Sequence, residues 1–121
     1  MFDIAYDAPA NILRIHVRDF WSPEDVTRFA GAVALALRDA RRVRSDFDII
    51  VESFDFPVQA NHVADLLAGI KDAGMTATSG RAAVVVGSRL NQLQAERTLV
   101  HPRVKVFATM EAAEAWLATP A

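Results

Sequence analysis

The sequence predicts an α/β domain with a mixed sheet of about five strands, a first strand that runs antiparallel, and four helices mainly on one face. Three observations predict this fold. Short strands alternate with helical patterns, which favours parallel strands joined by right-handed crossovers. The first two strand patterns flank a short polar turn, which is typical of a hairpin. Several strands alternate polar and apolar residues, whereas strands covered by helices on both faces are apolar throughout.

Length and composition set the class of protein. The 121 residues include 52% hydrophobic residues, 23% charged residues and no cysteine. This size indicates a single domain, 1–121, and the lack of cysteine excludes a disulfide framework and a thiol nucleophile. A net charge of −2 argues against a nucleic-acid partner, because nucleic-acid-binding domains are usually basic. No apolar run approaches the about 20 residues that a membrane span needs, so we expect a cytoplasmic protein.

The first half of the predicted fold is a hairpin followed by a helix. Residues 2–6 and 12–20 alternate in hydrophobicity around a polar turn. Ser22 is then a favourable N-cap, Pro23 suits the first helical position, and Asp25 lies three residues after the cap. We interpret the arginines that end this helix as partners of its negative dipole end rather than as a phosphate site: Arg38, Arg41, Arg42 and Arg44.

The second half repeats a strand-and-helix pattern three times. A strand at 47–52 leads into a helix from about Pro57 to Ala73, which Gly74 is placed to end. A largely apolar strand at 81–88 precedes a helix over 89–99 that Ser88 caps. The strand 103–107 is followed by a helix that Thr109 caps, with apolar residues at helical spacing: Ala113, Trp116 and Leu117.

One face of the predicted sheet carries charged residues. Arg14, His16 and Arg18 share one side of the second strand, Asp48 and Glu52 one side of the third, and Arg103 and Lys105 one side of the last. We expect Ile50, Ala83 and Val85 to form an apolar strip between them. This face is either a lightly covered solvent face or the contact surface of a homodimer, since a mixed apolar and charged strip suits a two-fold contact.

Four segments carry a family resemblance that covers nearly the whole chain: 11-NILRIHVRDFWSPEDVTRF-29, 47-FDIIVESFDFPVQANHV-63, 82-AAVVVG-87 and 104-VKVFATMEAAEAWL-117. Their order and spacing resemble the STAS domain, the fold of anti-sigma-factor antagonists, and more closely the compact SpoIIAA-like bacterial proteins. The resemblance implies a non-enzymatic binding or regulatory module. STAS domains that act as phospho-switches carry a phosphorylated serine where the second helix begins. The matching stretch here, 55-DFPVQAN-61, has no serine or threonine, and Ser53 lies at the strand end.

The junction between the third strand and the second helix is the candidate binding site. Our first hypothesis is that this loop docks a protein partner. The alternative is a carrier or sensor of an apolar small molecule or lipid, held between sheet and helices near Trp21 and Phe56. Each aromatic residue taken singly is also consistent with a core position. The candidate binding residues are Trp21, Phe54, Phe56, Pro57, Gln59 and Asn61.

The sequence contains little that points to catalysis. Its three histidines, His16, His62 and His101, have no ligand partner at the spacing of a metal site. There is no glycine-rich phosphate loop, and we interpret 87-GSR-89 as a plain N-cap rather than an anion site. We therefore predict no catalytic residue, no metal and no cofactor. A third hypothesis, an enzyme that uses His16 or His62 with a neighbouring carboxylate, stays open.

Overall fold

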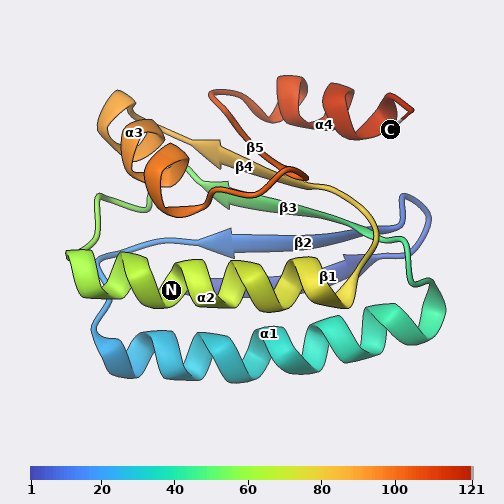
Figure 1. Cartoon of the computed structure of the whole chain (residues 1–121), viewed down its shortest axis with the longest axis horizontal. Helices are drawn as coiled ribbons and strands as arrows, with labels where there is room; N and C mark the ends of the chain where they lie inside the picture. Colours follow the sequence, from blue (N-terminus) through green and yellow to red (C-terminus); the bar gives the residue numbers. More distant parts are fainter. Residues whose placement is uncertain (121) are drawn as a thin grey trace.

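The computed structural model describes residues 1–120 and confirms the predicted mixed sheet (Figure 1). The strands lie side by side in chain order. β1 is antiparallel to β2, and the neighbours from β2 to β5 are parallel. The strands are β1 (Phe2–Asp7), β2 (Ile12–Val17), β3 (Asp48–Ser53), β4 (Ala82–Val86) and β5 (Val104–Phe107).

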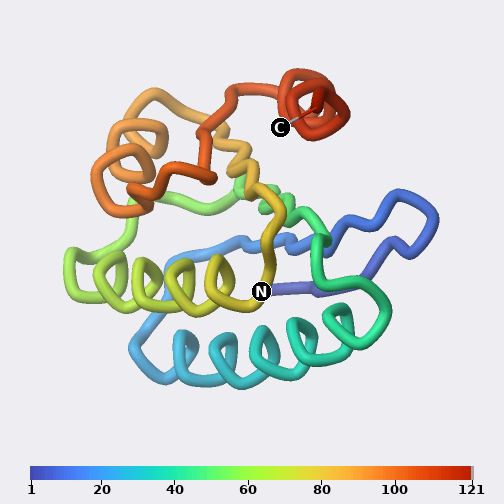
Figure 2. Tube along the Cα trace, turned by 45° about the vertical axis from the view of Figure 1, so that its right-hand side comes forward, coloured from blue at the N-terminus to red at the C-terminus, as the bar shows by residue number. Residues whose placement is uncertain are grey.

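The helices lie mainly on one face of the sheet, as the sequence predicts. Within residues 1–120 the helices are α1 (Pro23–Val43), α2 (Asn61–Ala77), α3 (Arg89–Thr98) and α4 (Met110–Ala118). α1, α2 and α3 bury their apolar residues against one face, and α4 packs against the other. Figure 2 shows α4 separated from α1 and α2 by the sheet.

The alternation of side chains along β3 divides the core between these two faces. Ile49 belongs to the larger apolar cluster, together with Phe29 of α1 and Val63 of α2. The next residue, Ile50, points the opposite way and joins Leu117 of α4. The middle strands β3 and β4 therefore carry apolar residues on both faces, and Ile12 at the start of β2 joins the cluster under α4.

The apolar strip predicted on an open face is in fact covered. Ile50, Ala83 and Val85 are 1%, 0% and 0% exposed, because Ala113 and Leu117 of α4 pack over them. The apolar side of α4 needs such a partner, and the connection from the edge strand β5 brings the helix to this face. A homodimer through the remaining open part of the face stays a prediction.

That open part of the face carries charges that pair within one chain. Arg14 Nε lies 3.1 Å from Asp7 Oδ2, and Arg18 Nη1 lies 2.8 Å from Asp3 Oδ2. The Arg18 contact holds the pKa of Asp3 below its usual value. These pairs are exposed, so each contributes little to stability.

The helix starts follow the predicted caps except in α2. The Ser22 hydroxyl accepts from the Asp25 N–H, and the hydroxyls of Ser88 and Thr109 accept in the same way at α3 and α4. α2 begins at Asn61 rather than Pro57, with Ala60 as a cap that offers no side-chain hydrogen bond. It also continues past Gly74 to Ala77. The residues before Asn61 are held instead by tertiary contacts of Gln59.

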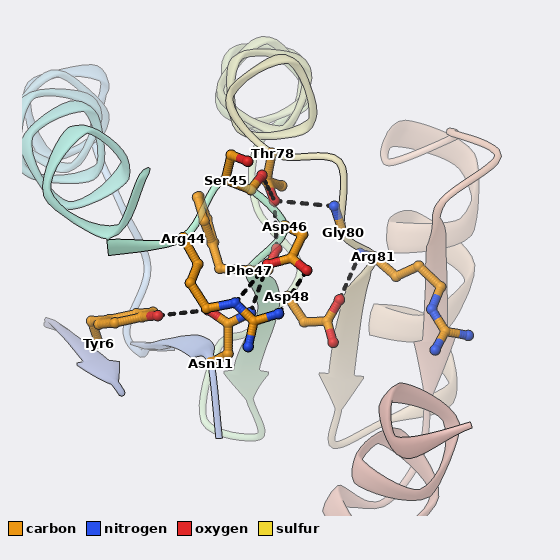
Figure 3. A network of polar contacts seen from close by, with 10 residues as sticks. All are labelled: Tyr6, Asn11, Arg44, Ser45, Asp46, Phe47, Asp48, Thr78, Gly80 and Arg81. Atoms are coloured by element: carbon orange, nitrogen blue, oxygen red, sulfur yellow. Dashed lines mark hydrogen bonds and ion pairs between the residues drawn. The ribbon is translucent and has the colours of Figure 1, made fainter. Parts of the chain in front are cut away.

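A polar network closes the amino-terminal edge of the parallel strands (Figure 3). Asn11, in a left-handed conformation with φ of 56°, donates to Asp46, and Arg44 binds the same carboxylate at 2.8 Å. The Arg44 guanidinium holds the pKa of Asp46 below its usual value. The Thr78 hydroxyl donates to the Phe47 carbonyl at 2.5 Å. These groups bond to one another, so their contacts connect β3 to the neighbouring strands and loops at this edge.

The arginines at the end of α1 make structural contacts. Arg38 Nη2 lies 3.2 Å from the Asp39 carboxylate, and Arg41 donates to the Ala77 carbonyl at the end of α2 at 2.8 Å. These contacts occupy both side chains with acceptors of the protein, and the pairing of the arginines with the dipole of α1 stays a prediction.

Candidate functional site

The loops at the carboxyl ends of β2 and β3 meet helix α3 around one buried amide, Gln59. Its side chain is 3% exposed. Gln59 Oε1 accepts from the Trp21 backbone N–H at 2.8 Å, and Nε2 donates to the carbonyls of Asp19 and Pro57 at 3.1 and 2.7 Å. The Gln59 backbone also exchanges two hydrogen bonds with the Gln94 side chain of α3, at 3.0 and 2.9 Å. Gln59 therefore joins the β2–α1 loop, the β3–α2 loop and α3.

Aromatic packing fixes the same loops from the inside. The Trp21 ring is 1% exposed and lies edge-on to Phe56, with ring centroids 5.0 Å apart. Phe29 of α1 approaches the other side of Trp21 at 4.9 Å. Trp21 Nε1 donates to the Arg18 carbonyl at 2.8 Å, so its polar atom is satisfied. Such aromatic pairs are worth about 0.5–1.5 kcal/mol beyond the area they bury.

Beyond Phe56 an apolar cavity of about 150 Å³ lies between the sheet and the helices α1, α2 and α3. Side chains of β2, β3, β4 and β5 form one wall, among them Ile15, Ile49 and Val84. Interiors are packed to crystal-like density and rarely leave voids larger than a water molecule. The space arises because small residues of α2, β4 and α3 occupy inward positions: Ala64, Gly74, Ala82 and Ala95.

The polar side chains that line the cavity direct their donors to backbone carbonyls. The Ser53 hydroxyl donates to Val85 at 2.6 Å, Gln94 donates to Gln59, and the Thr98 hydroxyl donates to Gln94 at 2.8 Å. The interior surface therefore remains apolar. Ser53 is 6% exposed, so the serine at the strand end is a buried structural group rather than an exposed replacement for the missing phosphorylation site.

Lys71 of α2 is the charged residue among the described residues that line the cavity. Its side chain is 13% exposed. The ammonium donates to the Val100 carbonyl at 2.9 Å and lies 2.7 Å from Asp72 Oδ1, and the residue also borders the apolar space. A lysine that buries its methylenes and keeps its charge at the surface is a common arrangement. The cavity thus has one cationic edge.

The candidate binding residues separate into two groups in space. Trp21 and Gln59 are buried, and Phe56 is half-buried and borders the cavity. Phe54, Pro57 and Asn61 are exposed and do not line it. The cavity lies deeper than these loop residues, and the sequence missed Lys71 and Gln94. The sequence offered one signal of this packing, Gly74. It lies inside a helix rather than at its end, and a glycine in a helix interior often marks a packing requirement.

A histidine–carboxylate couple lies on the uncovered half of the sheet. His16 Nε2 is 2.8 Å from Glu52 Oε2, and the two side chains are 36% and 34% exposed. The third hypothesis, an enzyme that uses a histidine with a neighbouring carboxylate, therefore stays open at His16. The couple lies on the opposite face of the sheet from the cavity, since His16 and Glu52 alternate with Ile15 and Val51, which line it.

Other kinds of site receive no support from the described part of the chain. Among residues 1–120, no three histidine or acidic side chains group as metal ligands. In the same range, no helix has the length and apolarity to cross a bilayer.

Comparisons with known proteins add no relative. No family model matches the chain, and no curated protein matches it. The resemblance to the STAS and SpoIIAA-like domains therefore rests on the order and spacing of the elements, and it stays a prediction.

Proposed function

We propose that this protein binds a small apolar molecule in the cavity between the sheet and α1, α2 and α3, as a carrier or sensor. The observation that carries the proposal is the apolar cavity of about 150 Å³. An apolar cavity of this size stays dry and accepts benzene-sized molecules.

The energetic cost of leaving the cavity empty supports the proposal. Cavity volume destabilises a protein by about 24 cal/mol per Å³, so this space costs roughly 3–4 kcal/mol. That is a large share of the 5–15 kcal/mol by which native proteins are typically stable. A bound ligand would offset the cost, because any molecule that binds the folded state stabilises it.

Benzene titration tests the proposal. We expect two-dimensional NMR of the full chain to show saturable shifts at the amides of Gly74 and Ala95, which line the cavity. Ala95→Leu fills the space and should remove these shifts while leaving the fold intact. Ala112→Leu makes the same change at an exposed site on α4 and should leave them unchanged. Absence of saturable shifts in the wild type would refute the proposal.

Docking of a protein partner through the β3–α2 loop is a second candidate function. Phe54 and Val58 are 39% and 42% exposed, and Phe20 in the adjoining β2–α1 loop is 63% exposed. A hydrogen bond of 3.1 Å from the Asp19 N–H to the Asp55 carbonyl connects the two loops. Contiguous exposed apolar residues mark interaction surfaces when they form a sizeable patch.

This docking candidate needs variants that leave the loop folded. Phe54→Ser and Val58→Ser alter exposed side chains, whereas changes at half-buried Phe56 or buried Gln59 would disturb the contacts that hold the loop. We expect the double variant to lose partners that the wild type recovers in a pull-down. Equal recovery by both proteins would count against docking at this loop.

A further inference from the structure

We propose that the ligand is a small monocarboxylic acid whose apolar body fills the cavity and whose carboxylate binds Lys71. The inference rests on the proposed function, because it assigns a chemical class to the occupant of the same cavity. Its basis is the place of Lys71, the one charged residue among the described residues that line the cavity.

The size of the cavity limits the apolar part of the ligand. A volume of about 150 Å³ accommodates a body of roughly benzene size. The lining offers that body aliphatic and aromatic surface from Leu67, Ile70, Met75 and Phe56. Ligands of this class include short-chain and simple aromatic acids.

The chemistry of Lys71 selects an anionic head group. An ammonium has three donors, and two of them are used by the Val100 carbonyl and the Asp72 carboxylate. The third donor remains for a ligand oxygen. The other polar side chains of the lining already donate to backbone carbonyls: Ser53, Asn91, Gln94 and Thr98.

Asp72 provides a second test of the assignment, in which a substitution should strengthen binding of the ligand. Its side chain is 67% exposed, and its carboxylate occupies the position beside the ammonium that a ligand carboxylate would share. Removing this charge should therefore strengthen binding of an anion, whereas removing the Lys71 charge should weaken it. A neutral ligand should respond to neither change.

Three probes separate the two proposals: benzene, phenylacetate and its neutral isostere phenylacetamide. We expect wild-type protein to bind phenylacetate about tenfold more tightly than phenylacetamide in an NMR titration, as a charge-assisted hydrogen bond allows. Lys71→Met should abolish this preference and still bind benzene. Lys71→Arg should retain the preference, and Asp72→Asn should increase it.

The failures of the two proposals differ. If benzene binds but phenylacetate and phenylacetamide bind equally, or if Lys71→Met keeps the preference, the carboxylic acid assignment is wrong and the apolar site stands. If neither benzene nor phenylacetate binds the wild type, both proposals are wrong. Benzene binding by Lys71→Met shows that this variant is folded, so a lost preference cannot be attributed to unfolding.

Discussion

Gln59 shows how one residue can be structural at a position where the sequence indicated a binding surface. Exposed polar residues in a strand-to-helix loop commonly bind partners. Here the amide is buried and makes hydrogen bonds with three backbone groups, those of Trp21, Asp19 and Pro57. A polar residue in such a loop can therefore be either a binding residue or a structural one, and its burial distinguishes the two.

Replacing Gln59 tests this structural role. We expect Gln59→Leu to lower the free energy of unfolding by about 1–3 kcal/mol, because the buried Trp21 N–H loses its acceptor while side-chain volume is nearly kept. Urea denaturation measures the change. Asn61→Ala, at an exposed site in the same segment, should stay within about 0.5 kcal/mol. An equal effect at both sites would contradict the role assigned to Gln59.

The capping box of α1 predicts a pH effect at a single carboxylate. The Ser22 backbone N–H, 2.8 Å from Asp25 Oδ2, holds the pKa of Asp25 below its usual value. A lowered folded-state pKa stabilises the protein above the unfolded value of about 3.9, and this contribution is lost as the pH falls through the folded value. Asp25→Asn should therefore show a smaller loss of stability than wild type between about pH 5 and pH 2. Urea denaturation at several pH values measures the free energy of unfolding of both proteins. If Asp25 contributes nothing, wild type and Asp25→Asn will lose stability in parallel as the pH falls.

At the scale of elements, α4 determines which part of the sheet is open. Its contacts bury Ile50, Ala83 and Val85 and leave the charged half of β1 and β2 exposed. Arg81 supports this position, since its guanidinium lies 4.6 Å from the Trp116 ring centre and donates to the Leu117 carbonyl at 3.3 Å. The helix thus removes from solvent the apolar strip that the sequence predicts on an open face.

Truncating the contact of α4 tests its importance. Leu117 is 8% exposed, so Leu117→Ala should cost about 2–5 kcal/mol of unfolding free energy and promote self-association through the uncovered strip. Urea denaturation and analytical size exclusion measure the two effects. The matched change Leu90→Ala, at a residue that is 68% exposed, should produce neither. A fully stable Leu117→Ala protein would show that α4 is not needed to cover the sheet.

At the scale of the whole molecule, we expect the part of the structure around the cavity and α3 to be less stable than the rest. α3 has ten residues, of which Ala95 is buried, and Leu90 and Leu93 point to solvent at 68% and 48% exposure. Ala95 packs in a small cluster with Val84 and Val86, and α3 also borders the cavity. Regions with few buried apolar contacts open at lower free energy than the core.

This imbalance predicts a pattern of hydrogen exchange. Amides of α3 should exchange faster than those of β3 and β4, and a saturating ligand in the cavity should slow α3 more than α1. Exchange followed by NMR with and without benzene measures both effects. Equal protection of the amides of α1 and α3 in the free protein would contradict the lower stability expected for α3.

The sequence by itself determined the order and nature of the elements, because strand alternation, helical spacing and caps such as Ser22 and Thr109 are local properties. It misplaced the start of α2 at Pro57, since contacts of Gln59 with Trp21 and Gln94 decide that segment. The position of α4, the cavity and the Lys71 edge were decided by tertiary structure alone. Each depends on residues from separate elements, and no local pattern specifies which small side chains will face one another.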